Sequence, residues 1–128
     1  MAKITLKDLS HSYLTKQNND VDWALRGVNI DWKDGGAYAL LGPSGCGKTT
    51  LLNIISGLLK PTTGEVLFDD KDVTSLNTVE RNIAQIFQFP VIYDTMTVFD
   101  NLAFPLKNRG LSETEIDSKV KEIGEMLE

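Results

Sequence analysis

The sequence predicts an α/β fold in which antiparallel strands precede a strand, a glycine-rich loop and a helix. Three observations support this class. Residues 2–9 alternate apolar and polar side chains, as a strand with one solvated face does, and residues 23–32 carry the apolar side chains of a second strand. Residues 37–41 form a short apolar run typical of a buried strand, and a helical stretch, residues 50–59, follows the glycine-rich segment. A chain of 128 residues is long enough to bury one core.

Composition and charge exclude several classes. The net charge is −5 and the isoelectric point about 4.8, so no basic field favours DNA or RNA. Cys46 is the single cysteine, which excludes a disulfide framework and favours a reducing, cytoplasmic compartment. We interpret Cys46 as a small residue tolerated in its loop rather than as a redox group. No leader segment is evident and no apolar run approaches the ~20 residues that span a bilayer, so direct membrane insertion is not expected.

The glycine-rich segment fits the pattern G-x-x-x-x-G-K-[ST] at every fixed position. Its residues are Gly42, Pro43, Ser44, Gly45, Cys46, Gly47, Lys48 and Thr49. The glycines allow backbone N–H groups to curl closely around a phosphate, Lys48 reaches the terminal phosphates, and the Thr49 hydroxyl binds Mg²⁺. The helix that begins near Thr50 directs its positive end at the same phosphates, and Thr50 completes the predicted nucleotide-binding set. The alternative is a glycine-rich turn that binds nothing.

The segments around this loop predict further elements. Residues 15–20 are polar and indicate a surface loop, and the helix after the loop is expected to end near Leu59-Lys60-Pro61. Residues 65–73 favour a hairpin with a tight turn at Asp69 and Asp70. These two acids could instead hold Mg²⁺, but the apolar run before them is short and follows Gly64 directly. Residues 82–88 predict a core strand with Gln88 at its exit.

The last third of the chain combines an apolar segment with a capped helix. Residues 90–106 are mostly apolar and are either buried or a contact face for a partner. We favour the contact face because the segment exceeds one strand and is broken by Pro105. Ser112 and Glu115 form a capping box that opens a helix over residues 113–128, with Ile116, Val120, Ile123 and Leu127 on one face. No stop signal follows Glu128, so we expect a domain that continues.

Tyr13, the phosphate loop and Gln88, in this order, resemble the ATP-binding subunit of ABC transporters over the whole chain. The resemblance implies a P-loop NTPase (RecA-like) core in three layers, an antiparallel β-subdomain at one side, and truncation at the start of the helical subdomain. Tyr13 resembles the aromatic residue that stacks on adenine in that family. Trp23 is a rival, because the insertion after Leu14 makes the spacing ambiguous, and either ring could simply be core. Gln88 resembles the glutamine that touches Mg²⁺ or the attacking water, so Gln88 and Lys48 are the expected catalytic residues.

The same resemblance implies boundaries, cofactors and partners. Residues 1–36 would be mainly the antiparallel subdomain, residues 37–89 the nucleotide-binding core, and residues 90–128 the segment after Gln88 with the start of the helical subdomain. Residues 89–106 are similar to carbohydrate, glycerol and glycerol-phosphate importers, where this segment faces the transmembrane permease. ATP and Mg²⁺ are the implied cofactors. A second nucleotide-binding subunit and the permease are the implied partners, on the inner face of the cell membrane.

Some family features are absent from the sequence. It contains no Leu-Ser-Gly-Gly-Gln signature, no strand ending in Asp-Glu and no switch histidine, since the single histidine, His11, lies far upstream. We therefore expect the N-terminal part of a longer ATPase subunit, which is catalytically inactive by itself. A soluble phosphotransferase is the alternative, although such kinases place the phosphate loop on their first strand. A non-catalytic binding module is the third possibility.

Overall fold

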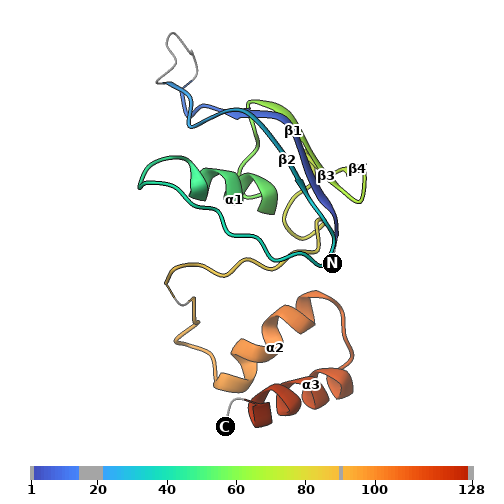
Figure 1. Ribbon diagram of the computed structural model, residues 1–128. Coiled ribbons are helices and arrows are strands. Elements are labelled where there is room, and N and C mark those ends of the chain that lie inside the picture. The colour runs from blue at the N-terminus through green and yellow to red at the C-terminus, as the bar shows by residue number, and fades with distance from the viewer. Residues whose placement is uncertain (1, 15–21, 90, 127–128) are drawn as a thin grey trace. The chain divides into compact units, whose positions relative to one another are not determined.

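The computed structural model describes residues 2–14, 22–89 and 91–126, and the chain divides between Gln85 and Ile86 into two units (Figure 1). The predictions for residues 15–20, Pro90, Leu127 and Glu128 lie outside the described residues. The first unit contains the strands β1 (Ile4–His11), β2 (Leu25–Trp32), β3 (Thr63–Phe68) and β4 (Lys71–Asp72) and the helix α1 (Lys48–Ser56). The second unit contains the helices α2 (Val98–Asn108) and α3 (Glu113–Met126).

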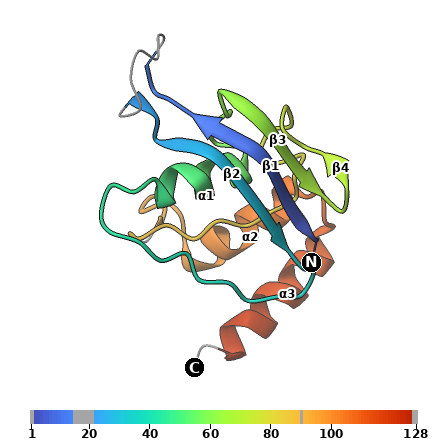
Figure 2. The same ribbon diagram turned by 45° about the horizontal axis from the view of Figure 1, so that its top comes forward.

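The strands of the first unit form one antiparallel sheet in the order β2-β1-β3-β4 (Figure 2). Leu6 of β1 pairs with Ile30 of β2 on one side and with Val66 of β3 on the other. The predicted antiparallel strands and the hairpin at Asp69 and Asp70 are confirmed. The sheet is not confined to residues 1–36, however, because β3 and β4 come from the segment after the phosphate loop.

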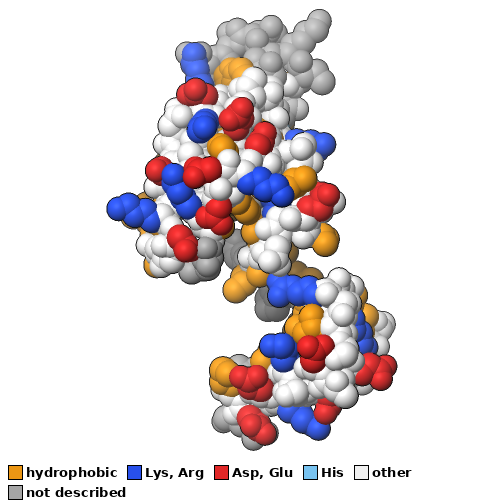
Figure 3. Space-filling model, turned by 90° about the vertical axis from the view of Figure 1, so that its right-hand side faces the viewer, with side chains coloured by type: hydrophobic (Ala, Val, Ile, Leu, Met, Phe, Trp, Pro, Cys, Tyr) orange, Lys and Arg blue, Asp and Glu red, His pale blue; other side chains and the backbone are white. Residues whose placement is uncertain are grey.

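One face of the sheet packs against α1, as Figures 1 and 2 show. The buried side chains that these elements share are Leu6, Leu9, Leu25, Leu51, Ile54, Ile55, Val66 and Phe68. On the face that Figure 3 shows, acidic and basic side chains of this unit are interspersed. Within this unit, Lys3 Nζ lies 3.5 Å from a carboxylate oxygen of Asp31 and 3.6 Å from one of Asp70. One side of the sheet is therefore apolar and covered by α1, although the buried run Val66, Leu67 and Phe68 in β3 departs from strict alternation.

The helix after the phosphate loop ends earlier than the sequence predicts. It stops at Ser56 rather than near Leu59, because Gly57 adopts a left-handed conformation with φ 82° and its N–H donates to Ile54 O at 3.2 Å. A left-handed glycine is a common helix stop. Pro61 thus lies beyond the end of the helix and does not cause it.

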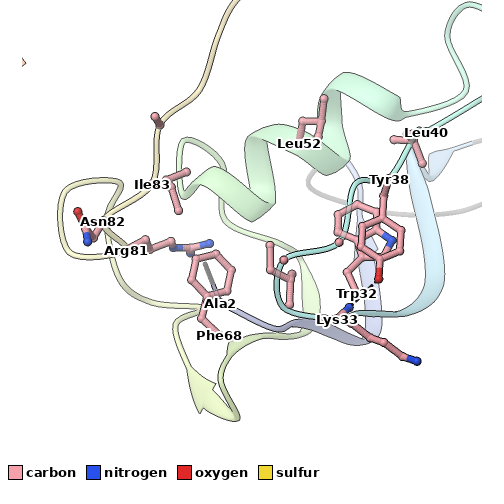
Figure 4. Close-up of a pocket in the computed structure, with 14 residues that line it drawn as sticks. Ala2, Trp32, Lys33, Tyr38, Leu40, Leu52, Phe68, Arg81, Asn82 and Ile83 are labelled. Atoms are coloured by element: carbon pink, nitrogen blue, oxygen red, sulfur yellow. Dashed lines mark hydrogen bonds between the residues drawn. The ribbon is translucent and has the colours of Figure 1, made fainter. Parts of the chain in front are cut away.

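Two predicted core strands are wrong. Residues 37–41 and 82–88 form no strand, and Leu41 and Ile86 are 88% and 97% exposed. A strand forms only where a neighbouring strand pairs with its backbone groups, and the described residues supply no such neighbour for these two segments. Parts of both segments instead line a cavity of about 710 Å³ (Figure 4), together with side chains from the sheet and from α1. Leu52, Phe68 and Ile83 are among its apolar walls.

The second unit is a pair of helices around a small apolar cluster formed by Ala103, Ile116 and Val120. The predicted capping box is confirmed. Ser112 N donates to Glu115 Oε2 at 2.9 Å, and Glu115 N donates to Ser112 Oγ at 3.4 Å. Pro105 lies inside α2, so the expectation that it breaks the apolar segment is wrong. The helix accommodates the ring at the loss of one backbone hydrogen bond.

Candidate nucleotide-binding site

The phosphate loop has the backbone that its glycines permit. Gly47 stands immediately before α1 with φ 89°, and a Cβ on it would lie 2.5 Å from Ala24 O. Gly42 faces the other side of the loop, where an added Cβ would lie 2.5 Å from Cys46 Sγ. Glycine is required at position 47, where the backbone is left-handed and a backbone oxygen is close, whereas at Gly42 the close neighbour is a side-chain sulfur. The loop is therefore folded tightly between β2 and the start of α1.

Lys48, the first residue of α1, turns its side chain back over this loop. Its Nζ donates to Gly42 O at 2.8 Å and to Pro43 O at 2.7 Å, and lies 3.6 Å from Cys46 Sγ. Among the described residues, no side chain caps the N-terminus of α1, and its first turn contains no acidic residue. The loop therefore has two sources of positive potential, which are the free N–H groups of that turn and the Lys48 ammonium. This arrangement suits a phosphate group.

The two threonines after Lys48 differ in their surroundings. Thr49 is exposed, as a residue that offers its hydroxyl to a metal on the phosphates must be. Thr50 is buried, and its Oγ1 lies 3.0 Å from the hydroxyl of Tyr13. In the part of the chain that the structure describes, no group of three or more His, Cys, Asp or Glu side chains gathers.

Tyr13 is brought to the phosphate loop although 37 positions separate it from Thr50. Its side chain is 66% exposed, and its ring meets the ring of His11 edge to face, with centroids 4.7 Å apart and planes at 87°. The rival Trp23 is half-buried. The sequence indicated Tyr13 as a site residue but did not predict its hydrogen bond to Thr50. No short-range sequence pattern connects two hydroxyl residues that are so far apart in the chain.

Gln88 does not stand at the exit of a strand, which corrects the prediction. It lies exposed in a bend of the second unit, whereas Tyr13, Lys48 and Thr50 belong to the first. The reason is the missing core strand over residues 82–88. Gln85 of the same segment does contact α1, through a hydrogen bond of 3.2 Å from its Nε2 to Asn53 Oδ1.

The apolar segment after Gln88 is shaped by Asn101, which the sequence analysis missed. The Asn101 side chain accepts from Tyr93 N at 2.9 Å and donates to the carbonyls of Tyr93, Met96 and Thr97 at 3.0–3.3 Å. Thr97 caps α2, with its Oγ1 accepting from Asp100 N at 3.1 Å. The spacing Thr-x-x-Asp could have revealed this start. The exposed apolar side chains that result are Val91, Ile92, Tyr93, Met96, Val98, Phe99 and Phe104.

A glycine-rich loop that leads into an uncapped helix N-terminus, with a lysine folded over it, defines a nucleotide-binding protein of the P-loop class. A family model described as "ABC transporter" matches residues 25–128. The chain belongs to the ABC transporter family.

Solved structures show the same fold. An ATP-binding cassette in a dimeric, post-hydrolysis state bound to ADP and Pi has a TM-score of 0.76 and 31% identity, over 93% of this chain and 54% of that one. A nucleotide-free cassette from an ABC transporter has a TM-score of 0.70 and 32% identity, over 91% of this chain and 45% of that one. The prediction of a P-loop NTPase fold with an antiparallel sheet is therefore confirmed.

Curated relatives include sn-glycerol-3-phosphate import ATP-binding proteins UgpC. The protein from Rhizobium meliloti is 43% identical and the one from Bordetella avium 38% identical, each over all 128 residues of this chain. The chain spans about a third of their length, 35% and 34% respectively. No helix within residues 2–14, 22–89 and 91–126 is long and apolar enough to cross a bilayer.

Proposed function

We propose that this chain is the nucleotide-binding part of an ABC importer's ATP-binding subunit and binds Mg·ATP at residues 42–49. The observation that carries the proposal is the position of Lys48 Nζ, which lies within hydrogen-bond distance of two loop carbonyls beside the uncapped end of α1. When a nucleotide binds, the charged oxygens of its terminal phosphate would replace these neutral carbonyls as acceptors for Lys48 Nζ. Hydrogen bonds between charged groups are stronger than those to neutral acceptors. The whole subunit would hydrolyse ATP to drive transport.

Each site residue has a proposed role. Gly42 to Gly47 surround the phosphates with backbone N–H groups, Lys48 binds the terminal phosphates, and Thr49 provides a ligand for Mg²⁺. Mg²⁺ supplies neutralisation of the charge on the phosphate oxygens. Tyr13 stacks on adenine, and Thr50 fixes the Tyr13 hydroxyl beside the loop. Gln88 contacts Mg²⁺ or the attacking water in the assembled subunit.

The solute is proposed from the relatives. Those named above are sn-glycerol-3-phosphate import proteins, so the solute class is a sugar, glycerol or glycerol phosphate. A second nucleotide-binding subunit is proposed because a related cassette is dimeric with ADP and Pi. The exposed apolar residues between positions 91 and 104 support a permease contact within residues 90–106, at the inner face of the cell membrane.

The soluble phosphotransferase is disfavoured by family membership and by the sheet. Both β1 and β2 precede the phosphate loop and belong to an antiparallel sheet, whereas a small kinase would place its loop after the first strand. A binding module without catalysis would share the phosphate loop. Phosphate release by the whole subunit separates that possibility from an ATPase.

Calorimetric titration of the Lys48→Ala variant with Mg·ATP tests the phosphate loop. Binding should be lost, because the ammonium that faces the terminal phosphates is removed. Lys60→Ala is the matched control, since Lys60 is an exposed lysine of the same unit outside the loop. Equal affinity in Lys48→Ala and Lys60→Ala would refute the assignment.

The adenine contact needs its own comparison. Tyr13→Ala should weaken ATP binding by about 1–3 kcal/mol, the usual contribution of a base stacked on an aromatic ring. Trp23→Ala should leave ATP affinity unchanged. A loss confined to Trp23→Ala would show that the insertion after Leu14 has shifted the adenine contact to the second ring.

The permease contact is tested by photo-crosslinking in membranes that contain the importer. A photoreactive amino acid at Val91 or Val98 should label a membrane protein, since both side chains are exposed and apolar. The same probe at Lys119, an exposed residue of α3, is the control. Labelling from Lys119 but from neither valine would contradict the proposed face.

A further inference from the structure

The end of β1 contains a buried histidine directly beside Tyr13. His11 is 6% exposed, and among the described residues neither of its ring nitrogens has a hydrogen-bond partner. A buried polar group without a hydrogen bond is unfavourable, so hydrogen bonding does not account for the position of this ring. Its ring contact is with Tyr13, edge to face at 4.7 Å. Tyr13 lies in a bend two residues beyond the end of β1, and there its ring contacts that of His11.

The backbone around His11 is fixed by neighbouring segments. Ala24 N donates to His11 O at 2.9 Å, and His11 pairs with Leu25 of β2. On the other side, Thr62 N donates to Ser10 O at 2.9 Å and Ser12 N to Thr62 Oγ1 at 3.0 Å. His11 is thus a rigid support, because segments on both sides of β1 hold the backbone that carries it.

Tyr13 contrasts with this support. Its side chain is two-thirds exposed and is held at two places, by the His11 ring at one and by Thr50 Oγ1 at its hydroxyl. An exposed aromatic side chain without such contacts would exchange between rotamers. We infer that His11 is a positioning residue for nucleotide binding, whose ring fixes the Tyr13 ring for stacking on adenine. This inference rests on the proposed function, because it requires that Tyr13 contact the base.

If the His11 ring holds Tyr13 ready for the base, removing it should affect only ligands that contain a base. Loss of the His11 ring should reduce affinity for a ligand that has a base but not for one that has phosphates alone. The relevant quantity is the ratio of the affinity for ATP to that for inorganic tripolyphosphate, measured by NMR titration of the 128-residue chain. In His11→Ala this ratio should fall about two- to tenfold, which corresponds to the contribution of one aromatic pair. His11→Phe, which keeps a ring at this place, should restore it.

The controls separate positioning from stability. Tripolyphosphate affinity should be the same in wild type, His11→Ala and His11→Phe, and an equal loss for both ligands would overturn the inference. His11→Leu fills the space without a ring and replaces His11→Ala if the latter does not fold. The aromatic ¹³C–¹H signals of Tyr13 should shift in His11→Leu without any ligand, and unchanged signals would also overturn the inference.

The inference and the proposed function fail differently. An unchanged ratio in the His11 variants, with a lowered ratio in Tyr13→Ala, overturns the role of His11 and leaves the adenine contact intact. An unchanged ratio in Tyr13→Ala overturns the adenine contact and the role of His11 with it. A lowered ratio in Tyr13→Ala and His11→Ala, restored in His11→Phe, supports both.

Discussion

Arg81 is a buried polar residue whose removal should strongly destabilise the first unit. It is 5% exposed, and its guanidinium joins the end of α1 to the segment after β4. Nη1 donates to Ile54 O at 2.7 Å and to Ile55 O at 2.9 Å, which are carbonyls in the last turn of the helix. Nε donates to Leu76 O and Nη2 to Thr74 O, both at 3.0 Å. The carbonyls at a helix end lack partners within the helix. Ile54 O also accepts from Gly57 N, so Arg81 adds a second bond there and supplies a partner for the buried Ile55 O.

The expected loss in Arg81→Ala follows from these contacts. A hydrogen bond to a charged group contributes about 1.5–3 kcal/mol, so the two bonds to the buried carbonyls give about 3–6 kcal/mol. This is a large part of the ~5–15 kcal/mol by which a whole domain is stable. Arg81→Lys keeps the charge but not the fork of donors, and should lose about half as much. Burial lowers the pKa of Arg81, yet the guanidinium stays charged, because arginine is not deprotonated in proteins.

Urea unfolding followed by tryptophan fluorescence measures this loss. Both tryptophans, Trp23 and Trp32, lie in the first unit and report on it alone. Lys60→Ala is the control and should change the free energy of unfolding by less than about 0.5 kcal/mol, as is usual for exposed positions. An Arg81→Ala variant within 1 kcal/mol of wild type, on the order of one neutral hydrogen bond, would refute this account of how α1 ends.

Three further predictions concern the metal, the second unit and catalysis. Thr49→Ala should weaken ATP binding with Mg²⁺ more than without it in a calorimetric titration, and equal losses would contradict its role as a ligand. The hydrogen bond from Ser112 lowers the pKa of Glu115 below its usual 4.5, so the capping box stabilises α3 fully above pH 4.5 and is lost as the pH falls through the lowered pKa. Helicity followed by circular dichroism should show this loss, and Glu115→Gln should abolish it. The 128-residue chain should release no more phosphate from ATP than its Lys48→Ala variant, and turnover that disappears with Lys48 would show a complete catalytic site.

The sequence predicted what short-range patterns encode. The phosphate loop is a contiguous motif, the strands β1 and β2 follow from alternation, and the box of Ser112 and Glu115 spans one helical turn. Each is local, so its residue types alone identify it. The early end of α1 was also readable, because Gly57 follows the helical residues directly.

The predictions that failed depend on distant partners. Residues 37–41 and 82–88 have the composition of core strands, but a strand exists only where another strand pairs with it. The roles of Arg81 and Asn101 were missed for a related reason. Each side chain donates to backbone carbonyls, and no residue type in the sequence shows which carbonyls need a partner. Apolar runs predict that a segment can be buried, and long-range pairing decides whether it becomes a strand.

The proposed nucleotide site has two parts, Tyr13 and the phosphate loop, and the end of the antiparallel sheet connects them. Gly47 of the phosphate loop packs so closely on β2 that an added Cβ would lie 2.5 Å from Ala24 O and 2.9 Å from a methyl carbon of Leu25. The same two residues hold the end of β1, where Ala24 N donates to His11 O and Leu25 pairs with His11. The pairing of β1 with β2 therefore contributes to the spacing between Tyr13 and the loop. A slip of one residue would turn every side chain of β1 to the other face, and it would displace Tyr13, two residues beyond the strand, from Thr50.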